Sequence, residues 1–170
     1  MKYVATVSIN LGSEKNDAAS RECETIEEAL QIFPADSSKP QTDSVRSDVA
    51  FNCLTITERG KIVAVYMKMM NKKTNGLEWV KRELNDKEFA ANEALVKSAL
   101  EQIERQINRA TTEDEFNKLH ERLQTEMTTD IDDLPKANPQ YKNKELRAKR
   151  QKLANRCGTR IEEIRRRTGT

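Results

Sequence analysis

The sequence has few of the residues from which catalytic centres and metal sites are built. It contains a single histidine, five glycines and three cysteines, at Cys23, Cys53 and Cys157. The cysteines are odd in number, far apart and never in a Cys-x-x-Cys motif, which argues against a disulfide framework and a zinc site. The glycines match neither phosphate-loop pattern. We therefore expect three reduced thiols, no catalytic residues, no bound metal and no cofactor.

Two polar features could still support chemistry. His120 could act as a general base, but no nucleophile and third partner accompany it, so we interpret it as a structural or surface residue. The acidic run of Asp130, Asp132 and Asp133 could bind a divalent cation. We interpret this run as part of a solvated linker, and a metal-dependent nuclease that uses its three carboxylates stays open as an alternative.

The chain also lacks a long hydrophobic run. No stretch approaches the roughly 20 apolar residues that a membrane-spanning helix needs. Near the N-terminus, Thr6 and Ser8 interrupt a short apolar run, and no cleavage site for a secretory signal follows it. We therefore expect a cytoplasmic protein with no membrane partner.

Charge, by contrast, is abundant and unevenly divided along the chain. Charged residues make up 34% of the sequence, and the net charge is +2. Residues 142–170 contain 11 lysines and arginines against 3 glutamates, a net charge of +8. Residues 1–141 contain 19 basic and 25 acidic residues, a net charge of −6. An acidic body with a basic C-terminal segment predicts contact with an anionic partner.

The first 75 residues have the patterns of a small β-α-β-β module. Alternation of apolar and polar residues from Tyr3 to Ile9 predicts a half-buried strand. A capping box of Thr25 and Glu28 predicts a short helix that Pro34 ends.

The rest of this module is predicted from turn residues and β-branched residues. We interpret the polar segments 10–24 and 34–47 as irregular connections. Residues 49–57 and 61–70 are rich in Val, Ile and Thr, and Gly60 lies between them, which predicts a β-hairpin.

Residues 76–128 follow a helical period instead. The first apolar stripe has steps of three and four residues, with Asp86 as the candidate N-cap. A capping box of Thr112 and Glu115 opens a second amphipathic helix. Since the connection between them is short, we expect an antiparallel helical hairpin. The two stripes consist of Phe89, Val96, Leu100, Ile103 and Ile107, and of Phe116, Leu119, Leu123 and Met127.

The C-terminal part is predicted as a linker and a last helix. Residues 129–140 are acidic and contain two prolines, which predicts a linker. Asn138 and Pro139, at its end, fit the N-cap and first position of a last helix, whose basic part covers 141–170. Cations interrupt the narrow apolar stripe of this helix, so we expect a surface element rather than part of a core. The predicted fold class is α+β: a small β-α-β-β module, an antiparallel helical hairpin and a basic C-terminal helix.

Three interpretations of the basic helix stay open. It is a solvated helix, a contact for nucleic-acid phosphates, or a docking element for an acidic protein surface, including this protein's own acidic run. The segment has no aromatic residue beyond Tyr141 to stack on a base, so any nucleic-acid contact is expected to be positional rather than sequence-reading. The candidate binding residues are Lys142, Lys144, Arg147, Lys149, Arg150, Lys152, Arg156, Arg160, Arg165, Arg166 and Arg167.

We therefore expect a non-catalytic interaction protein whose basic helix contacts nucleic acid or a nucleoprotein complex. The alternative is an inhibitor or adaptor that blocks a partner, such as a nucleic-acid-processing enzyme, through its helical hairpin or sheet surface. Trp79, interpreted as a residue at the start of a helix, and Met67 and Met69 are the candidate protein-interface residues. The hairpin also permits a homodimer.

Overall fold

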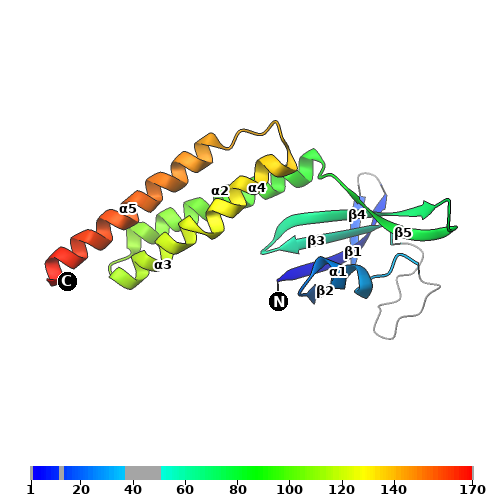
Figure 1. The fold of residues 1–170 in the computed structure, drawn as a ribbon, viewed down its shortest axis with the longest axis horizontal. Helices are drawn as coiled ribbons and strands as arrows, with labels where there is room; N and C mark the ends of the chain where they lie inside the picture. The colour runs from blue at the N-terminus through cyan, green and yellow to red at the C-terminus, as the bar shows by residue number, and fades with distance from the viewer. Residues whose placement is uncertain (1, 12–13, 37–50, 170) are drawn as a thin grey trace. The chain divides into compact units, whose positions relative to one another are not determined.

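The computed structural model describes residues 2–11, 14–36 and 51–169 and has an α+β architecture, as predicted (Figure 1). An antiparallel sheet with one short helix precedes a run of longer helices. The chain divides into two compact units, Met1–Glu88 and Phe89–Thr170, which are called the sheet unit and the helical unit below. Of the predicted irregular segment 34–47, the part from residue 37 onward lies outside the described residues, as does the predicted strand start at 49–50.

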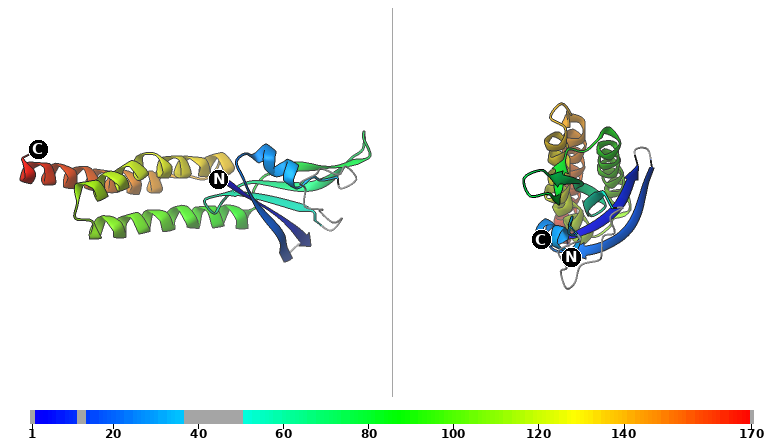
Figure 2. Two further views of the ribbon diagram at one scale, coloured as in Figure 1. Left: turned by 90° about the horizontal axis from the view of Figure 1, so that it is seen from below. Right: turned by 90° about the vertical axis from the view of Figure 1, so that its right-hand side faces the viewer.

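The sheet unit contains five strands in the order β2-β1-β3-β4-β5 among its described residues, with every neighbouring pair antiparallel. An irregularity in the β1–β2 register between Val7 and Ser8 bends this outer ribbon, and Figure 2 shows its curvature. The strands are β1 (Tyr3–Leu11), β2 (Glu14–Cys23), β3 (Cys53–Glu58), β4 (Lys61–Asn71) and β5 (Gly76–Arg82).

The hairpin predicted around Gly60 is confirmed. β3 and β4 pair from Cys53 opposite Met67 to Glu58 opposite Lys61, so only two residues form the turn. Both have positive φ, 50° at Arg59 and 81° at Gly60. This is the combination that a type I′ turn requires, and glycine adopts it without steric strain.

Two strands were missed by the sequence-based predictions. The segment 10–24 is mostly β2 rather than a loop, because Tyr3 opposite Cys23 through Leu11 opposite Glu14 form a ladder with β1. Its sequence, EKNDAASREC, lacks the apolar alternation of a half-buried strand, since many of its side chains are exposed. Residues 76–82 are β5, paired with β4, and not the beginning of the helical hairpin.

Helix α1 (Ile26–Ile32) covers one face of the sheet. One half of its predicted capping box is present: the Thr25 hydroxyl accepts a hydrogen bond from the Glu28 backbone N–H at 3.0 Å. The Glu28 carboxylate accepts from the Glu24 N–H, at 2.7 Å, one residue before the N-cap. Ala29 is fully buried, as is Phe33 at the end of the helix, and the apolar core that they share with the sheet includes Ala5, Val7, Leu54, Ile56 and Ala64.

Four longer helices follow, and three of them lie wholly within the helical unit. The predicted apolar stripe of the first is buried from Val96 to Ile107, and the predicted capping box of Thr112 and Glu115 is present. The N-cap of the first helix is Asn85 rather than Asp86, because its side chain accepts from the Glu88 backbone N–H at 2.8 Å. The four helices are α2 (Asp86–Arg109), α3 (Glu113–Gln124), α4 (Glu126–Ala137) and α5 (Lys144–Thr168).

Figures 1 and 2 show α2 running alongside α3 and α4. Helices α3 and α4 together form the second, bent arm of the hairpin, and α5 runs back along these two helices. Their apolar faces share one core, centred on the fully buried Leu100, Ile103, Leu123 and Met127.

The predicted linker over 129–140 is wrong, because α4 occupies most of it. In the sequence, the acidic residues interrupt and so obscure an apolar stripe of Met127, Ile131 and Leu134, which are all buried in the structure. Pro135 lies inside the helix and has no N–H to donate to the Ile131 carbonyl four residues earlier. The side-chain amide of Asn143 donates to that carbonyl instead, at 3.0 Å.

The last helix begins later than predicted. Asn138 and Pro139 precede it in a turn closed by a hydrogen bond from the Tyr141 N–H to the Asn138 carbonyl, at 2.9 Å, and Lys144 is the first helical residue. The helix continues through Gly158, which neither ends nor caps it.

Candidate functional site

α5 is part of the core of the helical unit, which corrects the prediction of a separate surface element. Its apolar stripe is buried at Leu146, Leu153, Ala154, Cys157 and Ile161. The stripe is narrow, but the helix packs on α3 and α4, and the long side chains beside it extend outward to water or to carboxylates. The basic residues of α5 therefore project from a fixed helix.

Many of these cations pair with carboxylates of other helices in the unit. Lys149 and Arg156 both face Glu104 of α2, at 3.5 and 3.8 Å. Arg165 donates to Glu113 of α3 at 2.7 Å. These partners lie outside the acidic run that the sequence analysis named as a docking surface within the protein; of the cations of α5, Arg147 pairs with a residue of that run, Asp132.

Four further cations have partners nearer in the chain or on a neighbouring helix. Arg147 lies 3.7 Å from Asp132 of α4, and Arg150 donates to the Leu123 carbonyl at 3.3 Å. Arg160 and Arg166 pair with Glu163 and Glu162 of α5 itself.

Four predicted binding residues are exposed, and their side chains have no hydrogen bond or ion pair to any described residue: Lys142, Lys144, Lys152 and Arg167. Lys142 lies two residues before α5, Lys144 is the first residue of the helix, Lys152 is near its middle and Arg167 is near its end. The unpaired positive charge is thus spread along the helix rather than concentrated in one patch.

An open groove of about 820 Å³ lies between the C-terminal end of α2 and the middle of α5. On α5, Lys152, Arg156 and Arg160 recur every four residues and so share one helix face. A second row with the same spacing consists of polar uncharged side chains. The lining residues are Ile107, Asn108 and Ala110 from α2 and its end, and Ala148, Gln151, Lys152, Asn155, Arg156, Thr159 and Arg160 from α5.

The groove is suited to an anion because of what its lining contains. It presents three cations, three side-chain amides and one hydroxyl, and no lining residue is a carboxylate. Arg156 is held across the groove by a 2.6 Å hydrogen bond to the Asn108 side-chain oxygen. Arg160 lies over the ring of Phe116, 5.7 Å from its centre. These contacts hold two guanidinium groups in place, while Lys152 is unpaired among the described residues.

Sequence-based reasoning identified the three cations of the groove but missed its polar residues. Gln151, Asn155 and Thr159 carry a signal that was available, a second row of polar residues at four-residue spacing. Asn108 and Ala110 carry none, since they are more than 35 residues away in the sequence and become neighbours only in the folded bundle.

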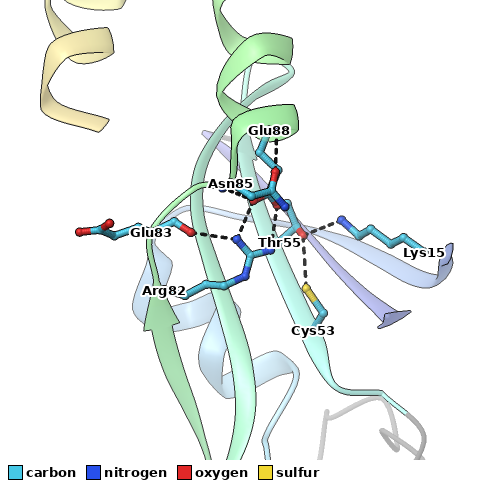
Figure 3. Close-up of polar contacts among 7 residues, drawn as sticks. All are labelled: Lys15, Cys53, Thr55, Arg82, Glu83, Asn85 and Glu88. Carbon is cyan, nitrogen blue, oxygen red and sulfur yellow. Dashed lines mark hydrogen bonds and ion pairs between the residues drawn. The ribbon is translucent and has the colours of Figure 1, made fainter. Parts of the chain in front are cut away.

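A second polar cluster, also missed, lies on the sheet unit and is drawn in Figure 3. Lys15 donates to the Thr55 hydroxyl at 2.9 Å, and the Cys53 thiol lies 3.9 Å from the same oxygen. Arg82 of β5 holds both carboxylate oxygens of Glu88, at 2.6 and 3.0 Å. The Asn85 N–H also donates to Glu88, at 2.9 Å.

The Arg82–Glu88 pair has a structural role, because it holds the first turn of α2 to the end of β5. Burial alone would raise the pKa of Glu88, but the hydrogen bonds from Arg82 and from the Asn85 N–H outweigh burial and lower it below its usual value. The same hydrogen bond raises the pKa of Arg82. With both partners charged and hydrogen-bonded, the cluster offers little capacity for a ligand.

The three candidate protein-interface residues all lie in the sheet unit. Trp79 is in β5 rather than at a helix start, and its indole N–H donates to the Phe33 carbonyl at 2.6 Å. Met67 is partly buried, whereas Met69 is 53% exposed. Other exposed apolar residues on the same two strands are Met70, Leu77 and Val80.

The acidic run and the histidine are also placed. Asp132 and Asp133 pair with Arg147 and Lys136, and Asp130 is buried on α4. His120 is partly buried on α3. Within residues 2–11, 14–36 and 51–169, no three His, Cys, Asp or Glu side chains form a group that could hold a metal ion.

No helix in the described part of the chain is long and apolar enough to cross a membrane. Comparison of the sequence and the structure with protein families, curated proteins and solved structures finds no match.

Proposed function

We propose that this is a non-catalytic binding protein that contacts the phosphate backbone of nucleic acid, free or within a nucleoprotein complex, through α5. The observation that supports this function is the groove between α2 and α5. It combines Lys152, Arg156 and Arg160 with three amides and has no carboxylate in its lining.

The chemistry of the lining matches phosphate oxygens. Guanidinium groups bind phosphates with two parallel hydrogen bonds, and amide and hydroxyl groups donate further ones. Each phosphate that a lysine or arginine neutralises also releases condensed counterions, which drives association at low salt.

Cations of α5 that already pair with carboxylates are less available to phosphates, so the proposed contact is limited to the groove and the unpaired lysines. Exposed ion pairs contribute only about 0 to 1 kcal/mol each. A phosphate can therefore displace the pair between Arg156 and Glu104, whose atoms are 3.8 Å apart. Arg165, at 2.7 Å from Glu113, and Arg160, which pairs closely with Glu163, are poorer candidates, so the proposal relies first on Lys152 and Arg156.

The test is the affinity of the purified protein for labelled mixed-sequence nucleic acid as a function of salt. Lys152→Ala is expected to weaken binding and to reduce the slope of log affinity against log salt by about 1, because one phosphate contact is lost. Lys118→Ala is the matched control, since Lys118 is an exposed lysine on α3 that pairs only with Asp114 four residues earlier. Absence of any binding at low salt would contradict the proposal.

The alternative function, an inhibitor or adaptor, is favoured by a different observation. Met69 and Met70 are 53% and 65% exposed, and Leu77 and Val80 add apolar surface on the paired strand. Methionine suits adaptable protein-binding surfaces. This alternative predicts a complex with a defined protein that survives nuclease treatment and is abolished by Met69→Glu with Met70→Glu, while the Lys152→Ala variant still forms it.

A further inference from the structure

We infer that the groove binds duplex nucleic acid in preference to a single strand. This inference rests on the proposed function and concerns which form of nucleic acid the same site accepts. It follows from the aromatic residues of the helical unit, from the composition of the groove and from the geometry of its cations.

No aromatic ring in the helical unit is fully exposed for stacking on a base. Its aromatic residues are Phe89, Phe116 and Tyr141, and its one imidazole, His120, is partly buried on α3 and does not line the groove. Phe116 is buried in the core, beneath Arg160. Phe89 and Tyr141 pack edge to face on each other, with ring centres 5.1 Å apart, and against the core.

The groove itself contains no aromatic residue among its ten lining residues. Proteins that bind single strands without sequence preference rely on base stacking upon aromatic side chains as well as on cationic grooves. A single strand bound here would therefore leave its bases without stacking partners, whereas a duplex keeps its bases stacked internally and presents phosphates.

The geometry of the cations agrees with this preference. Lys152, Arg156 and Arg160 lie on one face of a continuous helix, so they form a straight row that spans roughly 12 Å at 1.5 Å per residue. A duplex carries one phosphate charge for about every 1.7 Å of its axis, twice the axial charge density of one of its strands. A straight row of cations on one continuous helix, with Arg156 and Arg160 held in place by their contacts, gains most from a rigid ligand of high charge density.

The experiment compares a mixed-sequence DNA duplex with each of its two strands, at equal length and low salt, using the full chain. We expect the duplex to bind at least tenfold more tightly than either strand, and Lys152→Glu to weaken duplex binding. Equal or tighter binding of the strands would overturn this inference and leave the proposed function intact. If neither form binds, the proposed function fails as well.

A gain-of-function variant provides an independent arm. Asn155 lines the groove and is exposed, so Asn155→Trp would place one aromatic ring where a base could stack. We expect the affinity for the single strand to rise about tenfold, with little change for the duplex, because one stacked base contributes about that much. An equal gain for both forms, or a gain for the duplex alone, would contradict the argument from stacking.

Discussion

Asn143 illustrates at the scale of a single residue how this fold repairs a defect in its own helix. Pro135 leaves the Ile131 carbonyl of α4 without its helical donor, and the Asn143 amide reaches that carbonyl at 3.0 Å. Asn143 occupies the N-cap position of α5, yet its side chain makes no capping hydrogen bond there. Its identity is explained by the preceding helix rather than by the helix that it begins.

Asn143→Ala is expected to lower the free energy of unfolding by about 1 to 3 kcal/mol, because a partly buried carbonyl loses its partner. Asn143→Asp is expected to give no rescue, since a carboxylate caps helices well but has no proton to donate. Urea unfolding measures both. In a Pro135→Ala background, where residue 135 regains an N–H, Asn143→Ala should cost clearly less; additive effects would contradict the assignment.

Glu88 predicts a dependence of stability on pH. Because its pKa is lower in the folded protein than in the unfolded chain, the unfolded state takes up a proton more readily. The stabilisation is therefore complete above the unfolded-state pKa, about 4.3, and is lost as pH falls through the lower, folded-state pKa. Glu88→Gln should destabilise the sheet unit at pH 7 and make little difference in strong acid.

Unfolding followed by the fluorescence of Trp79 measures this effect, because Trp79 is the single tryptophan and belongs to the sheet unit. Glu121→Gln is the control, an exposed carboxylate on α3. A constant difference between the Glu88→Gln variant and the parent protein from pH 7 into strong acid would exclude the Arg82–Glu88 pair as its cause.

At the scale of an element, Gly158 lowers the stability of α5. It lies in the interior of α5, where glycine is less favourable than alanine, and nothing lies within 4 Å of the position that a Cβ would occupy. Gly158→Ala should therefore raise the free energy of unfolding by about 0.5 to 1 kcal/mol. Gly60→Ala, at φ +81°, should do the opposite. Loss of stability in Gly158→Ala would contradict the open environment of this residue.

The elements that could be predicted from the sequence are those whose burial pattern is regular. The stripe from Val96 to Ile107 and the hairpin around Gly60 are of this kind. β2 was missed because its polar sequence carries no alternation, and α4 because three aspartates and Pro135 obscured Met127, Ile131 and Leu134. In both cases pairing with a distant element, and not local preference, determines the structure.

The candidate site divides in the same way. The row of Lys152, Arg156 and Arg160 is visible in the sequence because its spacing is helical. Other features of the site depend on how three helices pack. These are the ion pairs of Glu104 and Glu113 with α5 and the position of Asn108 in the groove. No pattern within a single segment contains that information.

At the scale of the whole molecule, α5 has to be treated as structural as well as functional. A chain that ends at Leu134 would lose the buried residues Leu146, Leu153, Cys157 and Ile161. Truncating one such core side chain costs about 2 to 5 kcal/mol, and small domains are stable by only about 5 to 15 kcal/mol. We expect α2 and α3 to unfold in the truncated chain while the sheet unit stays folded.

Far-UV circular dichroism of the truncated chain should therefore lose more helix than α5 alone accounts for, and Trp79 fluorescence should remain that of the folded sheet unit. Retention of helical α2 and α3 would show that α5 is dispensable for the core. Charge substitutions such as Lys152→Ala, rather than deletions, are accordingly the variants that separate binding from folding.

The bond between Arg156 and Asn108 joins residues 48 positions apart. A synthetic peptide copied from residues 144–168 would carry nearly all the positive charge of the C-terminal segment but only the α5 side of the groove. It would adhere to polyanions of any kind, as flexible polycations do, and would not distinguish a double helix from its separated strands. Selectivity for the double helix would then require the α2 side of the groove, which is distant in the sequence, as well as α5.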